Sequence, residues 1–150
     1  MNYLIIICFL EVLKLNIIME NKILHLSLKK EWFKLIESGI KIEEYRELKE
    51  YWLNRLLNNP KPEDKEFWTN ILRKSKKAHN KFPFLTLKKQ LIEQFGVKPY
   101  THVSFRYGYT QKTIMFKIKE ITIGIGNKEW GAPDEDVFII KLGERYEENN

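Results

Sequence analysis

Charged side chains gather in one short segment, GIKIEEYRE, at residues 39–47. Its alternating isoleucines predict a half-buried strand. Glu44 and Arg46 share strand parity, so they project to the same face and can pair, and Lys41 joins them if the start of the strand is irregular. Such a cluster offers a mobile amine, a carboxylate base and a bidentate anion clamp, which suits a pocket for a polar ligand. The alternative is a solvated edge strand whose charges discourage aggregation.

A later strand-like segment, residues 101–107, holds further candidate ligand contacts. Arg106 and His102 share its polar face, and Arg106 could supply a phosphate contact beside the charged cluster. Tyr107 and Tyr109 flank a glycine, and aromatic side chains in such a turn can stack on a base, a contact worth about 1–3 kcal/mol. The alternatives are a solvated strand face for the arginine and packed turn positions for the tyrosines.

The strongest basic run, RKSKKAHNK at residues 73–81, lies in the middle of the chain. Residues 49–98 carry 12 Lys and Arg against 5 Asp and Glu, whereas residues 129–150 carry 7 acids against 2 bases. The run has the composition of a patch that binds a nucleic-acid backbone independently of sequence. The other interpretation is the polar side of a surface helix. The candidate backbone contacts are Arg73, Lys74, Lys76 and Lys77.

Length and composition indicate one globular domain in a chain of 150 residues with 43% apolar side chains. The net charge of +6 suits an anionic partner, most simply nucleic acid. The single cysteine, Cys8, excludes an internal disulfide framework and favours a reducing cytoplasm. One cysteine and three scattered histidines give no metal-ligand spacing, so no metal and no cofactor are predicted.

The N-terminal residues 1–18 are predicted to be an extension outside the domain, with Met19 as the biological start. Their apolar run, Tyr3–Leu10, is far shorter than the roughly 20 residues of a membrane span. A basic start and a small-residue cleavage site, which a signal peptide would need, are both missing. The alternative is a short extra strand or helix packed on the domain.

The remaining chain, residues 19–150, is predicted to form a single α+β domain built on a small, mostly antiparallel barrel with flanking helices. Residues 48–99 form a helical insertion in this scheme. The slipped apolar phase near Ile118 predicts a bulge or a sharp bend. Strands are predicted at residues 22–28, 40–47, 101–107, 113–125 and 137–142. Helices are predicted at residues 29–38, 48–59 and 86–95, and from Pro62 onward.

The pattern Gly39-x-Lys41-x-x-Glu44-x-Arg46 is similar to the GxKxxExR signature of the ASCH family, relatives of the PUA RNA-binding domain. The preceding helix KKEWFKLIESG and the closing segment ITIGIGNKEWGAPDEDVFIIKLGE also resemble the family, so the likeness covers roughly residues 22–47 and 101–143. The resemblance implies a six-stranded PUA-like barrel. It also implies a cleft beside the signature that binds RNA or a nucleotide.

Some small members of this family are amidohydrolases that deacetylate acetylated cytidine with a lysine, a threonine and a glutamate, and others act on RNA as nucleases. Lys41 matches the catalytic lysine, Glu44 stands in place of the threonine, and Glu120 is the counterpart of the glutamate. The resemblance therefore also suggests a hydrolase acting on a modified nucleoside or on RNA. In that alternative Glu44 or Glu43 is the general base and Lys41 stabilises negative charge.

The leading expectation is a cytoplasmic protein that binds RNA or a nucleotide in a cleft lined by Lys41, Glu44 and Arg46. A third possibility is an adaptor whose inserted helices present aromatic side chains to another protein. The aromatic residues in question are Trp52, Phe67 and Trp68.

Overall fold

The computed structural model describes residues 22–58, 61, 63–64, 66–68, 70 and 90–147. The predicted extension at residues 1–18 lies outside the described residues. So do the four candidate backbone contacts of the basic run, which are Arg73, Lys74, Lys76 and Lys77.

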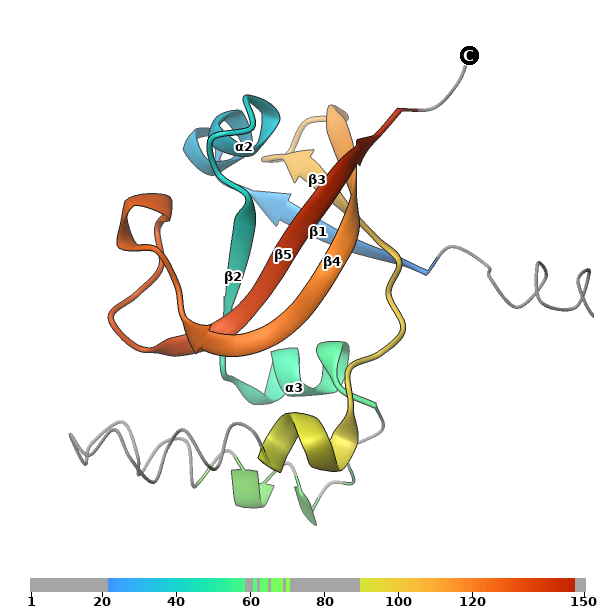
Figure 1. The fold of residues 1–150 in the computed structure, drawn as a ribbon, viewed down its shortest axis with the longest axis vertical. Helices are drawn as coiled ribbons and strands as arrows, with labels where there is room; N and C mark the ends of the chain where they lie inside the picture. Colours follow the sequence, from blue (N-terminus) through green and yellow to red (C-terminus); the bar gives the residue numbers. More distant parts are fainter. Residues whose placement is uncertain are drawn as a thin grey trace, which may run out of the picture.

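The described chain forms a curled sheet of five strands in the order β1-β3-β4-β5-β2 (Figure 1). β1 runs parallel to β3, and every other neighbouring pair is antiparallel. The sheet closes into a half-barrel, with β1 and β2 as its two edges. The predicted α+β class and the mostly antiparallel sheet are therefore confirmed, but the described strands form a five-stranded half-barrel with two edges in place of the predicted barrel. The strands are β1 (Ile23–Leu28), β2 (Glu43–Glu47), β3 (His102–Tyr107), β4 (Thr113–Ile125) and β5 (Asp136–Tyr146).

Short helices cover the ends of the half-barrel (Figure 1). The first described helix ends as predicted, because Gly39 adopts a positive φ of 78° that suits glycine. Residues 90–95 are helical, which confirms the described part of the helix predicted at residues 86–95. None of the described helices is long and apolar enough to cross a membrane. Two of these helices are α2 (Lys30–Glu37) and α3 (Glu50–Leu56), and a 3-10 turn, η1, spans Lys128–Trp130.

The main core lies inside the curl of the sheet. In β1 the leucines at alternate positions are buried and the residues between them are not, as the period-2 pattern predicts. α2 contributes Phe33 and Ile36, which are three positions apart and therefore share one helical face. α3 contributes Leu53 and Leu56 to the same cluster by the same spacing.

A β-bulge in β4 contributes to the curvature. The pairing of β4 with β5 shifts register between Phe116 and Ile118 and again between Ile118 and Glu120. A bulge bends its strand and increases the local twist. The phase slip near Ile118 therefore predicted the irregularity correctly.

β3 departs from its predicted alternation. His102 and Ser104 are buried although they were expected on a polar face with Arg106, and Arg106 alone of the three is exposed. The first four residues of β3 are all buried, so both faces of the strand are covered there. The His102 ring contacts the Tyr146 ring edge-on, at 5.2 Å between centroids.

Candidate functional site

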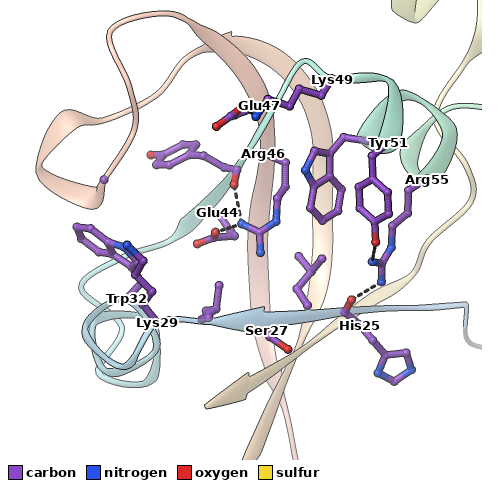
Figure 2. A pocket seen from close by; sticks show the side chains of 15 residues that line it. His25, Ser27, Lys29, Trp32, Glu44, Arg46, Glu47, Lys49, Tyr51 and Arg55 are labelled. Atoms are coloured by element: carbon purple, nitrogen blue, oxygen red, sulfur yellow. Dashed lines mark hydrogen bonds and ion pairs between the residues drawn. The ribbon is translucent and has the colours of Figure 1, made fainter. Parts of the chain in front are cut away.

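A cleft of about 620 Å³ lies where the two edge strands of the half-barrel face each other. We call it the seam cleft. β1, β2, α2 and α3 supply its walls, together with Gly131 at the end of η1. Figure 2 shows Trp32 at one end, Tyr51 and Arg55 at the other, and Glu44 with Arg46 between them.

Aromatic and charged side chains dominate the lining of the seam cleft. Cationic residues outnumber acidic ones, so the local charge is positive and favours an anionic ligand. The aromatic members are Trp32, Tyr45, Tyr51 and Trp52. The cationic members are Lys29, Arg46, Lys49 and Arg55, and the acidic members are Glu44 and Glu47.

The charged cluster predicted from the signature is present in the structure. Glu44 Oε2 lies 3.2 Å from Lys41 Nζ, and Glu44 Oε1 accepts a hydrogen bond from Arg46 Nη1. The side chains of Lys41, Glu44 and Arg46 are only 2%, 7% and 14% exposed. β2 begins at Glu43, so Lys41 lies before the regular strand, and its side chain does not have to follow the alternation of side chains between the two faces of the strand. Two cations thus share one carboxylate in a largely desolvated position.

Lys41 lies behind the wall of the seam cleft and is not one of the lining residues. Its Nζ donates a hydrogen bond to the carbonyl of Trp130 at 2.7 Å and lies 4.4 Å from the Tyr45 ring centroid. Burial lowers the pKa of Lys41 below its ordinary value, and the Glu44 carboxylate opposes that shift. The Lys41 ammonium therefore connects β2, through Glu44, to the segment that contains η1.

Glu44 Oε2 is a buried acceptor without a hydrogen-bond partner among the described residues. Its 3.2 Å contact with Lys41 is an ion pair that lacks hydrogen-bond geometry. Buried polar atoms are nearly always hydrogen-bonded, and exceptions often mark functional positions or water sites. Glu44 also lines the seam cleft, so its carboxylate is a candidate ligand contact.

Arg55 and Trp52 belong to the site but were not predicted there. Arg55 donates to the Tyr51 hydroxyl at 2.7 Å and to the backbone carbonyl of His25, so it connects α3 to β1 across the seam. The guanidinium carbons of Arg46 and Arg55 lie 5.0 and 5.5 Å from the Trp52 ring centroid. The only available sequence signal was the helical spacing of Tyr51 and Arg55, four positions apart on the helix after the signature.

Trp32 reaches the seam cleft from α2 and packs against Gly131. A Cβ atom at Gly131 would lie 2.6 Å from Trp32 Cζ2, and the φ of Gly131 is 85°. Both the backbone conformation and the close approach therefore require glycine. In the sequence, helical spacing places Trp32 only on the apolar face of the helix predicted at residues 29–38. In the structure it is half-buried and forms one end of the cleft.

The other predicted site residues do not line the seam cleft. Arg106 is exposed on β3, and the Tyr107 ring packs edge-on against Phe33 at 5.0 Å between centroids. Glu120 forms an ion pair with Lys141 at 2.8 Å and is not part of the Lys41–Glu44–Arg46 cluster.

The aromatic residues of the adaptor hypothesis have three different environments. Trp68 is buried in the main core, Trp52 is half-buried in the seam cleft, and Phe67 is 58% exposed. The two tryptophans therefore do not form an exposed patch together.

Among the described residues, no group of three or more His, Cys, Asp or Glu side chains could hold a metal ion. Comparisons of the chain with protein-family models, with curated proteins and with solved structures find no match. The resemblance to the ASCH family therefore rests on the signature and its neighbouring segments in the sequence.

Proposed function

We propose that the half-barrel is a PUA-like domain of the ASCH type and that its seam cleft binds a nucleotide or a short single-stranded stretch of RNA. The observation that carries the proposal is the mixture of side chains in one cleft. Trp32 and Trp52 offer aromatic rings, and Arg46 and Arg55 offer guanidinium groups.

This mixture matches the two halves of a nucleotide. A base stacked on an aromatic side chain is stabilised by about 1–3 kcal/mol, and every base has a face that can stack. Guanidinium groups bind phosphate oxygens through charge-assisted hydrogen bonds, often two at a time. The positive charge of the whole chain, +6, adds a longer-range attraction for the same ligands.

The size of the cleft favours a small ligand. Its volume of about 620 Å³ falls within the range of sites that enclose single small molecules. A nucleotide is of this size, whereas a duplex would contact only the rim. An RNA ligand would therefore insert one unstacked nucleotide, as is usual for sequence-specific RNA recognition.

The test is a calorimetric titration with the four ribonucleoside monophosphates and a short single-stranded RNA. We expect W32A to weaken binding of the best ligand by about 5- to 150-fold, the equivalent of one lost stacking contact. The matched control is Y109A, because Tyr109 is a fully exposed aromatic residue outside the cleft. The proposal is wrong if no probe binds, or if W32A and Y109A have equal effects.

A further inference from the structure

Arg55 is held in one position at the far end of the seam cleft from Trp32 (Figure 2). Its Nη1 donates to the Tyr51 hydroxyl and its Nη2 to the His25 carbonyl. Its guanidinium also lies 5.9 Å from the Tyr51 ring centroid and 5.5 Å from that of Trp52. A ligand that binds Arg55 therefore meets a guanidinium that has already lost most of its rotamer freedom.

The charge of Arg55 is not balanced by a carboxylate among the described residues. Both acidic residues of the cleft are engaged elsewhere, Glu44 with Lys41 and Arg46 and Glu47 with Lys49. The oxygens that Arg55 contacts belong to a hydroxyl and a peptide group, which carry no net charge. An anion at this end of the cleft would therefore gain a charge-assisted bond without displacing an existing ion pair.

Arg55 also retains hydrogen-bonding capacity. A guanidinium has five N–H donors in a planar fork, and the two partners of Arg55 use only part of them. The remaining donors suit the several oxygens of a phosphate group. Arg46 is less suited, because its Nη1 already donates to Glu44 and to the carbonyl of Tyr45.

We infer that Arg55 forms a phosphate subsite, so that the seam cleft selects nucleotides over nucleosides. This inference rests on the proposed nucleotide-binding function and adds the orientation of the bound nucleotide. The base lies at the Trp32 end, and the phosphate lies at the Arg55 end. Trp52 is then a positioning residue that supports the arginines and not the surface on which the base stacks.

The test compares a nucleoside, its 5′-monophosphate and inorganic phosphate on wild-type protein, R55Q and R145Q. We expect the wild-type protein to bind the monophosphate about 10- to 150-fold more tightly than the nucleoside, as one charged hydrogen-bonded contact gives. In R55Q this ratio should approach one while the nucleoside affinity stays unchanged. R145Q is the matched control, because Arg145 is an exposed arginine on β5 that does not line the cleft, and it should keep the wild-type ratio.

Inorganic phosphate should compete with the monophosphate on the wild-type protein and not on R55Q. R55K keeps the positive charge but loses the planar set of guanidinium donors, so it should give an intermediate ratio of monophosphate to nucleoside affinity. R55K replaces R55Q in the experiment if R55Q does not fold. If R55Q or R55K keeps the wild-type ratio of monophosphate to nucleoside affinity, the inference is overturned, but the proposed nucleotide-binding function still stands. Failure of every nucleoside and nucleotide to bind the wild-type protein overturns the proposed function as well.

Discussion

Replacing Glu44 by glutamine removes the only carboxylate that Lys41 and Arg46 share in the described structure. The glutamine has nearly the same shape, so packing changes little and the loss is mainly one of charge. Lys41 and Arg46 would then be two neighbouring cations with side chains only 2% and 14% exposed. In the unfolded chain both cations are fully hydrated, so the substitution raises the free energy of the folded state alone.

The expected cost follows from the burial of the pair. Breaking a buried ion pair by removing one partner destabilises a protein by about 3–5 kcal/mol. Breaking an exposed pair costs about 0–1 kcal/mol. A typical domain is stable by about 5–15 kcal/mol in total, so E44Q should lose a large part of its stability. Urea denaturation followed by tryptophan fluorescence measures this difference directly.

The control for burial is E144Q. Glu144 Oε2 lies 3.2 Å from Lys117 Nζ, the same distance as in the Glu44–Lys41 pair, but these side chains are 84% and 57% exposed. E144Q should therefore change the free energy of unfolding by less than about 1 kcal/mol. Equal effects of E44Q and E144Q would show that burial does not control the strength of these pairs, and the reasoning would fail.

A substitution of Lys41 tests the same ion pair through its other partner. In the E44Q background, K41M removes the buried ammonium that has lost its partner, so it should restore part of the stability. The double variant should therefore be more stable than the sum of the two single effects predicts, as expected for residues in direct contact. Additive effects would mean that Lys41 and Glu44 do not interact in the folded protein.

Two further variants probe the surroundings of the cluster. G131A should be less stable than G108A by about 1–3 kcal/mol, because both glycines have positive φ but only a Cβ at Gly131 would meet Trp32, at 2.6 Å; denaturation compares the two, and equal losses would contradict the contact. Between the lowered pKa of Lys41 in the folded protein and its ordinary value of 10.5, the Lys41 side chain binds more protons in the unfolded chain, so its contribution to the free energy of unfolding should rise with pH. K41M should abolish that rise, and identical pH profiles of the wild type and K41M would refute it.

The local elements could be predicted where one physical pattern dominated. The alternating leucines of β1 sit on an edge strand whose inner face alone is buried, so period 2 appears clearly in the sequence. The pattern failed in β3, where His102 and Ser104 are buried on the face expected to be polar. Which strand has both faces covered depends on contacts between distant segments, and a single sequence does not show those contacts.

The site was predicted in part for the same reason. Glu44 and Arg46 could be paired from strand parity, because both lie on one short strand. Trp32 and Arg55 come from helices on either side of that strand, and helical periodicity says which face of a helix is apolar but not which cleft it borders. Lys41 was expected to contact the ligand, and its burial behind the cleft wall depends on the loop that carries Trp130.

The position of Lys41 changes what its mutation can reveal about the signature. Its Nζ fixes the carbonyl of Trp130, the next residue is Gly131, and Gly131 packs against the indole of Trp32. A change at Lys41 can therefore move the Trp32 end of the cleft without Lys41 touching a ligand. Loss of binding in a Lys41 variant is consequently no proof of contact. The residues that identify a ligand in this cleft are those on its surface, Trp32 for a base and Arg55 for a phosphate.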